Sequence, residues 1–301
     1  MRAVLLTGYG GVDRLELSDA PEPVAAAGEL KVRMTASSVN PIDVKLRSGA
    51  LRQWVPLELP AVLGRDACGE VVAAGPGTRA FQTGAKVLGL VNRAYAEFVV
   101  AREEAWAELP GSLDPVDAAA LPLVVLTGTQ LIEEAVRPRP GEVVLITGAV
   151  GSVGRAAVFA ARARGAEVVA GVRRRQKDEA GKLDVDVVAL DDDAELEQLP
   201  RVDAIADTVG GETIAKLLRK VKTGGTIGTV LGEPPGAKEL GLAVRAHLVH
   251  PDSGQLVALA QAVAQGELVI PIAQRLPLSQ IREAHTLAEK GAGGKIVLRI
   301  G

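Results

Sequence analysis

At 301 residues the chain is long enough for two domains. Its composition, with 48% hydrophobic and 24% charged residues, is typical of a globular protein. A formal net charge of −3 argues against a nucleic-acid or acidic-membrane partner, and no apolar run reaches the roughly 18 residues of a membrane span. A single cysteine, Cys68, excludes an internal disulfide and any zinc site built from several cysteines, and without a signal peptide we expect a cytoplasmic protein.

The first 120 residues are predicted to be rich in β-structure. Short apolar stretches separated by Gly and Pro turns are typical of a barrel or sandwich. The expected strands cover residues 1–7, 15–17, 29–36, 69–74, 86–91 and 94–100. A helical turn is expected after residues 40–43, up to Gly49.

From Pro115 onward helices and strands alternate, which predicts an α/β fold with a doubly wound parallel sheet of the Rossmann type. The expected helices cover residues 115–121, 126–135, 155–164, 212–221 and 253–265, and the expected strands cover 143–146, 167–172, 187–190, 202–206 and 226–231. The tail, with strands at 270–275 and 295–300 around a helix at 279–290, is expected to pair with the N-terminal domain. The predicted organisation is a β-rich domain of residues 1–120, a dinucleotide-binding domain of residues 121–266 and a return segment of residues 267–301.

The turn after the strand at 143–146 predicts a nucleotide site. In a dinucleotide-binding unit, a first glycine (here Gly148) allows a sharp turn, a second (Gly151) lets main-chain N–H groups approach a pyrophosphate, and a third (Gly154) lets the helix pack closely. The helix N-terminus adds free donors and partial positive charge. Glycines alone would also fit an ordinary turn of an α/β protein, but the flanking strands favour the nucleotide site. The candidate binding residues are Gly148, Ala149, Val150, Gly151, Ser152 and Val153.

The end of the second strand of this unit predicts which cofactor is bound. NAD-binding units usually carry an acidic residue there for the ribose 2′-hydroxyl, whereas this chain has Arg173, Arg174 and Arg175, with Lys177 close behind. Guanidinium groups accept a 2′-phosphate that a carboxylate would repel. The alternative is a solvated basic start to the next helix, which would interact unfavourably with the helix dipole. We therefore predict NADPH, with Gly171, Arg173 and Arg174 among its binding residues.

Two compositional biases indicate a thermophilic source. Arg outnumbers Lys by 23 to 11, and asparagine occurs only at Asn40 and Asn92. Scarcity of thermolabile residues is typical of heat-adapted proteins. A GC-rich genome would produce the same excess of Ala, Arg, Gly and Val.

Several motifs occur in an order and spacing that extend over nearly the whole chain. They are residues 38–43, 63–71, 95–98, the glycine turn, 207–211 and 294–298. Together they resemble the zinc-independent branch of the medium-chain dehydrogenase/reductase superfamily, the quinone oxidoreductases that include zeta-crystallin. The resemblance implies a discontinuous GroES-like domain beside the Rossmann sheet, and a homodimer that pairs through that sheet.

The resemblance also implies a metal-free protein. Zinc-dependent relatives have a cysteine ligand at the position of Asn40 and a His-Glu pair at Arg65-Asp66, and neither Asn40 nor Arg65 is a zinc ligand. The three histidines, His247, His250 and His285, lie far down the chain and are expected at the surface or between domains.

Further residues are implied only by the family pattern. It places Asn40 and Thr127 beside the nicotinamide as catalytic and cofactor-binding residues, and Lys177 on the 2′-phosphate. Other positions match family residues that line the nicotinamide site, and these are Val209, Val230, Leu231 and Gly232. From the residues themselves, Asn40 could instead be a polar turn residue before Pro41, and Thr127 a helix N-cap.

The expected function is an NADPH-dependent transfer of hydride to a quinone or an α,β-unsaturated carbonyl, because conjugated acceptors delocalise charge without a metal. Family tyrosines that flank the acceptor pocket are replaced here by Lys45 and Leu51, which argues against a phenolic proton donor. An enoyl-thioester reductase is the alternative among enzymes. A non-catalytic NADPH- or RNA-binding protein is the other alternative, although 2% aromatic residues offer few stacking platforms for RNA.

Overall fold

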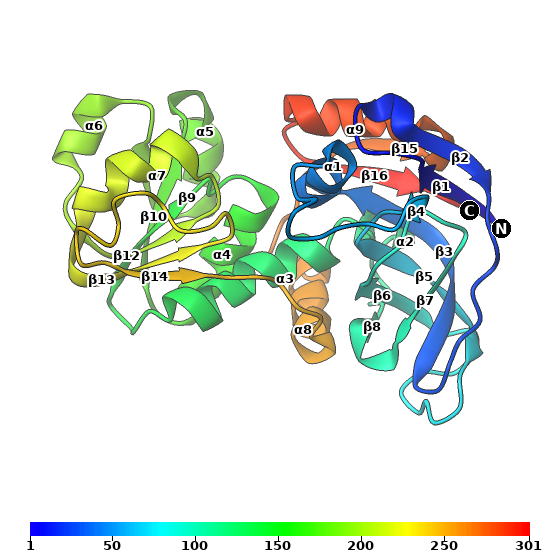
Figure 1. Cartoon of the computed structure of the whole chain (residues 1–301). Helices are drawn as coiled ribbons and strands as arrows, with labels where there is room; N and C mark the ends of the chain where they lie inside the picture. Colours follow the sequence, from blue (N-terminus) through cyan, green and yellow to red (C-terminus); the bar gives the residue numbers. More distant parts are fainter. The chain divides into compact units, whose positions relative to one another are not determined.

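The computed structural model describes residues 1–301, and the chain divides into two compact units (Figure 1). The first unit contains Met1–Leu123 and Pro251–Gly301, and the second is Val124–His250. The second unit therefore ends before α8 (Ser253–Ala264), whereas sequence analysis placed that boundary at residue 266. The difference arises because α8 packs against β8 (Trp106–Glu108), a strand of the first unit.

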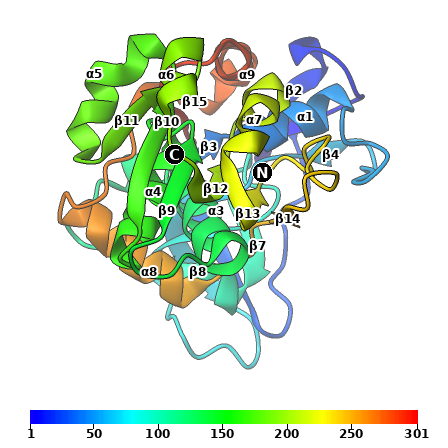
Figure 2. The ribbon, with the colours of Figure 1, turned by 90° about the vertical axis from the view of Figure 1, so that its left-hand side faces the viewer.

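The second unit is built on a six-stranded parallel sheet with the order β11-β10-β9-β12-β13-β14 (Figure 2). Its strands are β9 (Val143–Thr147), β10 (Glu167–Val172), β11 (Asp186–Ala189), β12 (Val202–Asp207), β13 (Val221–Thr229) and β14 (Ala243–Ala246). Numbered from β9, this is the 3-2-1-4-5-6 order of a doubly wound Rossmann sheet, as predicted. The strand order reverses between β9 and β12, and such sheets bind ligands outside the carboxyl ends of the strands at that point.

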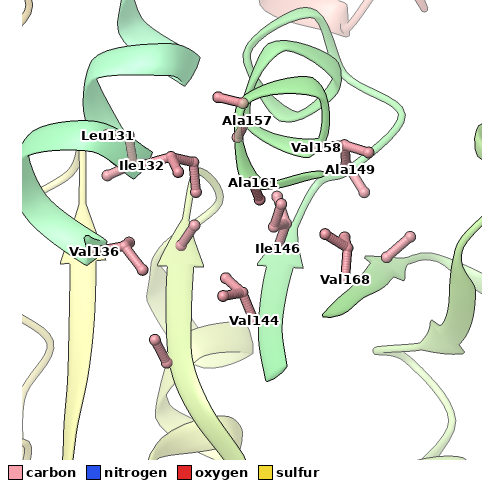
Figure 3. Close-up of a cluster of buried hydrophobic side chains, with 14 of the residues drawn as sticks. Leu131, Ile132, Val136, Val144, Ile146, Ala149, Ala157, Val158, Ala161 and Val168 are labelled. Atoms are coloured by element: carbon pink, nitrogen blue, oxygen red, sulfur yellow. The ribbon is translucent and has the colours of Figure 1, made fainter. Parts of the chain in front are cut away.

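Both faces of this sheet are covered, as parallel strands require. On β9, Val144 and Ile146 pack with α4 (Ser152–Ala163) and with η3 (Leu131–Val136), a π-helical stretch (Figure 3). Leu145 lies in the core on the opposite face. The other helices are α3 (Pro122–Gln130), α5 (Lys177–Ala180), α6 (Asp193–Gln198) and α7 (Gly211–Leu217), with 3-10 turns η4 (Arg174–Gln176), η5 (Gly181–Leu183) and η6 (Leu218–Lys220).

The first unit is mainly antiparallel. A seven-stranded sheet has the order β15-β16-β3-β5-β6-β8, with β7 also paired to β3, and a smaller sheet has the order β2-β1-β4. The remaining strands are β1 (Arg2–Leu6), β2 (Leu15–Asp19), β3 (Glu29–Val39), β4 (Ala61–Val62), β5 (Asp66–Ala74), β6 (Lys86–Leu90), β7 (Phe98–Arg102), β15 (Ile272–Pro277) and β16 (Lys295–Arg299). The helices are α1 (Pro41–Ser48), α2 (Pro115–Ala118) and α9 (Ile281–Lys290), with 3-10 turns η1 (Val12–Arg14), η2 (Glu103–Ala105) and η7 (Leu278–Gln280).

The pairing expected between the tail and the N-terminal segment is present. Strand β16 runs antiparallel to β3, with Ile296 opposite Val39 and Arg299 opposite Ala36. This register brings Lys295 to the end of β3, just before Asn40. None of the helices in the chain combines the length and the apolar character needed to cross a bilayer.

Candidate functional site

The turn between β9 and α4 is open at the helix N-terminus. Gly151 is the N-cap of α4, no side chain caps the helix, and its first turn contains no acidic residue. The Gly151 N–H donates to the Gly148 carbonyl at 2.8 Å and closes the turn. Because the first N–H groups of an α-helix have no intrahelical partner, an uncapped N-terminus of this kind is suited to bind a phosphate.

The three glycines of the turn differ in what surrounds them. Gly148 has φ +66°, a conformation that strains other residues. A Cβ at Gly154 would lie 2.1 Å from the Gly148 carbonyl oxygen, so only glycine lets α4 pack this closely on the turn. Gly151 is exposed, and its Cβ would lie 3.1 Å from the same oxygen. The roles predicted for the first and third glycines agree with this geometry, and the approach of a pyrophosphate at Gly151 stays a prediction.

The other predicted residues of the turn divide by burial. Ala149 and Val150 are buried, whereas Ser152 and Val153 are half-buried in the first turn of α4. Gly171, near the end of β10, accepts the Ala149 N–H through its carbonyl at 3.3 Å. Gly171 therefore supports the turn from the neighbouring strand.

A buried hydrogen-bond network joins the carboxyl ends of β9, β12 and β13. Asp207 accepts hydrogen bonds from the hydroxyls of Thr147 at 2.8 Å and Thr229 at 3.3 Å. It also accepts the N–H groups of Val209 at 3.2 Å and Gly210 at 3.0 Å. Residues 207–211 stand out in the sequence only as part of a family pattern, because the threonine partners of Asp207 come from strands that are distant in the sequence. The network fixes the segment after β12 at the point where the strand order reverses.

Two apolar side chains are exposed just after these strands. Val209 follows β12 and is 45% exposed, and Leu231 follows β13 and is 42% exposed. Val230 instead packs against the core of the unit, and Gly232 is exposed with φ +97°. A Cβ at Gly210 would lie 2.9 Å from Leu231 Cδ1, so the two segments are in contact. Exposed apolar groups at this edge are suited to pack against a flat ring.

The three arginines after β10 are exposed and Lys177 is half-buried, and two of these basic residues have acidic partners. The Arg174 guanidinium lies 2.6 Å from Asp192, and the Lys177 ammonium lies 2.8 Å from Glu195, where its hydrogen bond holds the pKa of Glu195 below the ordinary value. The Arg173 side chain forms no ion pair. The sequence pattern does not reveal these acidic partners, because α6 and the loop before it bring them back to the end of β10. A phosphate here would have to share Arg174 and Lys177 with carboxylates.

Thr127 lies inside α3 and is 7% exposed. Since α3 begins at Pro122, the N-cap interpretation of Thr127 is wrong. At the next residue, Gly128, a Cβ would lie 2.3 Å from the Val153 carbonyl oxygen, so α3 packs tightly on the first turns of α4. This packing brings the turn of α3 that carries Thr127 close to the start of α4.

A second polar cluster is buried in the first unit, where β3, β5 and β16 meet. Asp66 and Lys295 form an ion pair of 3.1 Å, with side chains 0% and 5% exposed. The Asn40 amide donates to Asp66 at 2.8 Å, and its oxygen accepts from Lys295. The Ser38 hydroxyl donates to the same carboxylate oxygen, and the other oxygen accepts the Leu123 N–H at 2.7 Å. The cluster therefore satisfies both charges internally.

Asn40 is held on several sides by this cluster. It is completely buried, and both polar atoms of its amide are hydrogen-bonded within the cluster. It is the N-cap of α1, and its N–H donates to Asp43 at 2.9 Å. These contacts make Asn40 a link within the cluster, and its place beside the nicotinamide stays a prediction.

The residues do not fit a zinc ion. No group of three or more His, Cys, Asp or Glu side chains is placed to hold a metal. The Lys295 ammonium donates to the amide oxygen of Asn40. Arg65 donates from Nε to the Val91 carbonyl at 3.0 Å. Cationic groups at these positions would repel a metal cation.

Two of the three histidine side chains are buried rather than at the surface. His285 is completely buried in the first unit, and burial lowers its pKa to about 3. In the second unit, His250 is half exposed and its Nε2 lies 2.9 Å from Glu134. The side chain of His247 is largely buried, and burial holds its pKa below the ordinary value.

Comparisons with known proteins cover both units. The family described as alcohol dehydrogenase GroES-like domain matches residues 26–111, and the family described as zinc-binding dehydrogenase matches residues 180–298. A quinone oxidoreductase of Pongo abelii is 30% identical over an alignment of 322 positions, gaps included, that covers 99% of this chain and 97% of that protein. A chloroplastic quinone-oxidoreductase homolog of Spinacia oleracea is 34% identical over 198 residues, and the match spans 62% of this chain but only 60% of that protein. A mycobacterial protein solved in complex with NADPH has a TM-score of 0.86 at 27% identity, with 100% of each chain covered.

Proposed function

Because the chain belongs to the zinc-independent quinone oxidoreductase branch of the medium-chain dehydrogenase/reductase superfamily, we propose that it is an NADPH-dependent reductase of quinones or α,β-unsaturated carbonyls. The observation that carries the proposal is the uncapped turn between β9 and α4, at the reversal point of a 3-2-1-4-5-6 sheet. The similarity to quinone oxidoreductases over almost the whole chain supports this reaction class.

The second unit contains candidate binding groups for the pyrophosphate and for the 2′-phosphate of the cofactor. The first N–H groups of α4, at Ser152 and Val153, are suited to the pyrophosphate. Arg173 is the first candidate for the 2′-phosphate because its side chain has no competing carboxylate. Arg174 and Lys177 would join it by exchanging Asp192 and Glu195 for the phosphate oxygens.

The nicotinamide end is assigned to the segments after β12 and β13. Val209 and Leu231 present apolar surface there, and Asp207 holds the first of these segments in place. Thr127 stays a proposed neighbour of the ring, since α3 packs against the start of α4. When bound, NADPH supplies a hydride from its nicotinamide ring. The role of the protein residues is to exclude water from the nicotinamide ring and to align the ring with the acceptor.

The acceptor class follows from what the protein residues offer. They do not fit a metal that would polarise a simple carbonyl, so the acceptor has to delocalise the incoming charge itself, as quinones and enones do. We assign Asn40 as a positioning residue rather than a polarising one, because Asp66 and Lys295 hold its amide. The expected homodimer would use the free edge of the parallel sheet at β14, where most residues are exposed.

The test is steady-state oxidation of NADPH with a panel of quinones, enones, enoyl thioesters and, as a control, saturated aldehydes and ketones. We expect turnover with quinones or enones and none with the saturated carbonyls. Clear preference for enoyl thioesters would replace the proposal by an enoyl-thioester reductase. Binding of NADPH without oxidation by any acceptor would leave a non-catalytic NADPH-binding protein.

A further inference from the structure

A hollow of about 230 Å³ lies on the first unit, where segments that are distant in the sequence meet. Arg2, at the start of β1, lines this hollow together with Arg299 and Ile300, at the end of β16 and just after it. Both ends of the chain therefore reach the same place (Figure 1). Pockets for drug-sized ligands have volumes of roughly 300–1,000 Å³, so this hollow is suited to a smaller molecule.

Part of the lining of the hollow is apolar. Leu278, at the start of η7, is buried in the core of the first unit, and Leu17 of β2 and Ile300 pack against the same core. Leu17 and Ile300 are only half-buried, so part of their apolar surface stays accessible in the hollow. A hydrocarbon group laid against this surface would remove it from water, which is favourable.

The hollow also carries two cationic groups that are free to bind a ligand. The guanidinium groups of Arg2 and Arg299 form no hydrogen bond or ion pair within the chain. Glu97 is the acidic side chain of the lining, and one of its oxygens already accepts the Arg2 main-chain N–H at 2.7 Å. Two guanidiniums and one carboxylate leave the lining with one net positive charge.

These groups define the class of ligand. A guanidinium binds a carboxylate through two parallel hydrogen bonds, which makes arginine suited to this anion. One net positive charge is balanced by a monoanion, whereas the Glu97 carboxylate would repel a second negative charge. The Ser279 hydroxyl adds a hydrogen-bonding group to the lining. The apolar surface beside these groups favours a ligand that also has a short hydrocarbon part.

We propose that this hollow binds a small monocarboxylate with a short hydrocarbon chain, and that it is distinct from the cofactor site proposed in the second unit. The carboxylate would bind Arg2 and Arg299. The hydrocarbon chain would pack against Leu17, Leu278 and Ile300. Because such a ligand binds only the folded protein and contacts both terminal segments, its binding would also stabilise the first unit.

Titration calorimetry of the full-length protein with hexanoate tests the proposal. We expect saturable binding by the wild type, and binding at least about 10-fold weaker in both Arg2→Gln and Arg299→Gln. Both variants should fold normally, because β1 and β16 pair through main-chain groups at these positions. Arg201→Gln is the control, since this exposed arginine of the second unit has no side-chain partner and lies outside the hollow. It should leave the affinity for hexanoate unchanged.

Two further ligands test the assigned class. Hexan-1-ol has a comparable chain without the charge, and inorganic phosphate has negative charge without the chain. Each should bind at least about 10-fold more weakly than hexanoate, and equal binding of either would overturn the class.

The location of the site is overturned if hexanoate does not bind saturably, or if the wild type and both hollow variants bind it equally. A loss of hexanoate binding in Arg173→Ala, with none in Arg2→Gln or Arg299→Gln, would place the ligand at the phosphate site of the second unit and would also overturn the proposal. No titration uses NADPH or an acceptor, so the result does not depend on the proposed enzyme activity.

Discussion

Lys295 and Asp66 are 229 residues apart in the sequence and form a buried ion pair of 3.1 Å. The same ammonium donates to the Asn40 amide oxygen, and the same carboxylate accepts the Leu123 N–H at the start of α3. Because an ammonium group can face only the oxygen of an amide, the pair fixes the orientation of Asn40. It thereby ties β3, β5 and β16 to Leu123, within the first unit.

Replacing Lys295 with Met is expected to cost about 3–5 kcal/mol of unfolding free energy, because the substitution leaves the Asp66 carboxylate buried without its counter-ion. Urea unfolding of the two proteins measures the loss. The matched control is Lys238→Met, whose pair with Glu233 is on the surface and should matter little. Equal effects of the two substitutions would contradict the assigned role of the buried pair.

Asp43 is expected to make stability depend on pH between about 4 and 6. Burial raises the pKa of Asp43 from 3.8 to about 6, so the folded protein binds this proton more tightly than the unfolded chain does. This raised pKa means that the contribution of Asp43 is most favourable below pH 4 and is lost as the pH rises through about 6. At 1.36 kcal/mol for each pH unit between the two pKa values, the loss amounts to about 3 kcal/mol.

The measurement compares urea unfolding of the wild type and Asp43→Asn at a series of pH values. Asn cannot titrate, so the difference in unfolding free energy between the two proteins should move in favour of the variant as the pH rises. The carboxylates with lowered pKa values, such as Glu22 and Asp203, are common to both proteins and cancel. A difference that stays constant from pH 4 to 7 would show that Asp43 has an ordinary pKa.

Substitutions at two glycines of the turn should have separate effects, one on the stability of the fold and the other on the affinity for NADPH. Gly154→Ala places a Cβ 2.1 Å from a backbone oxygen and should cost at least about 2 kcal/mol of stability. Gly151→Ala should cost no more than about 1 kcal/mol, yet weaken NADPH binding about 10-fold or more, because its methyl group covers the main chain at the phosphate site.

Thermal unfolding and fluorescence titration with NADPH measure the two effects of these glycine variants. Gly111→Ala is the control, since its Cβ would have no neighbour within 4 Å, and it should change neither quantity. Unaltered NADPH affinity in Gly151→Ala would show that the cofactor does not approach the turn.

The basic residues after β10 should determine the preference for the phosphorylated cofactor. Arg173→Ala is expected to lower NADPH affinity about 10-fold and leave NADH affinity unchanged, since only the former carries the 2′-phosphate. Asp192→Asn should have the opposite effect, because it frees Arg174 while the Asn side chain can still cap α6. Inhibition constants of 2′-phosphorylated and unphosphorylated adenosine nucleotides report these changes. Equal losses for both nucleotides would place Arg173 away from the phosphate.

The features that sequence analysis predicted well are those set by local pattern. The strand, glycine turn and helix from β9 to α4 lie within about 20 consecutive residues, so apolar runs and glycines define them. Strand β14 has only four residues, Ala243–Ala246, with one half-buried side chain, and it carries no comparable signal. The strand expected at residues 94–100 begins only at Phe98, because the Tyr95 carbonyl accepts a hydrogen bond from Val4 instead.

The polar networks could not be read from the sequence because their members meet only after folding. Asp66 and Lys295 come together through the pairing of β16 with β3, and Asp192 reaches Arg174 through the loop that follows β11. His285 is buried because α9 turns its apolar face, with Ile281 and Ala284, into the core of the first unit. The identity of each residue was visible, but its partner depended on topology.

The most direct test of the central claim is titration calorimetry of the full-length protein with NADPH and, under the same conditions, with NADH. We predict saturable binding of one NADPH per chain, with an affinity at least about 10-fold higher than that for NADH. Equal affinities would contradict the role of the arginines, and the absence of saturable binding to either nucleotide would contradict the assignment of the turn between β9 and α4 as the cofactor site.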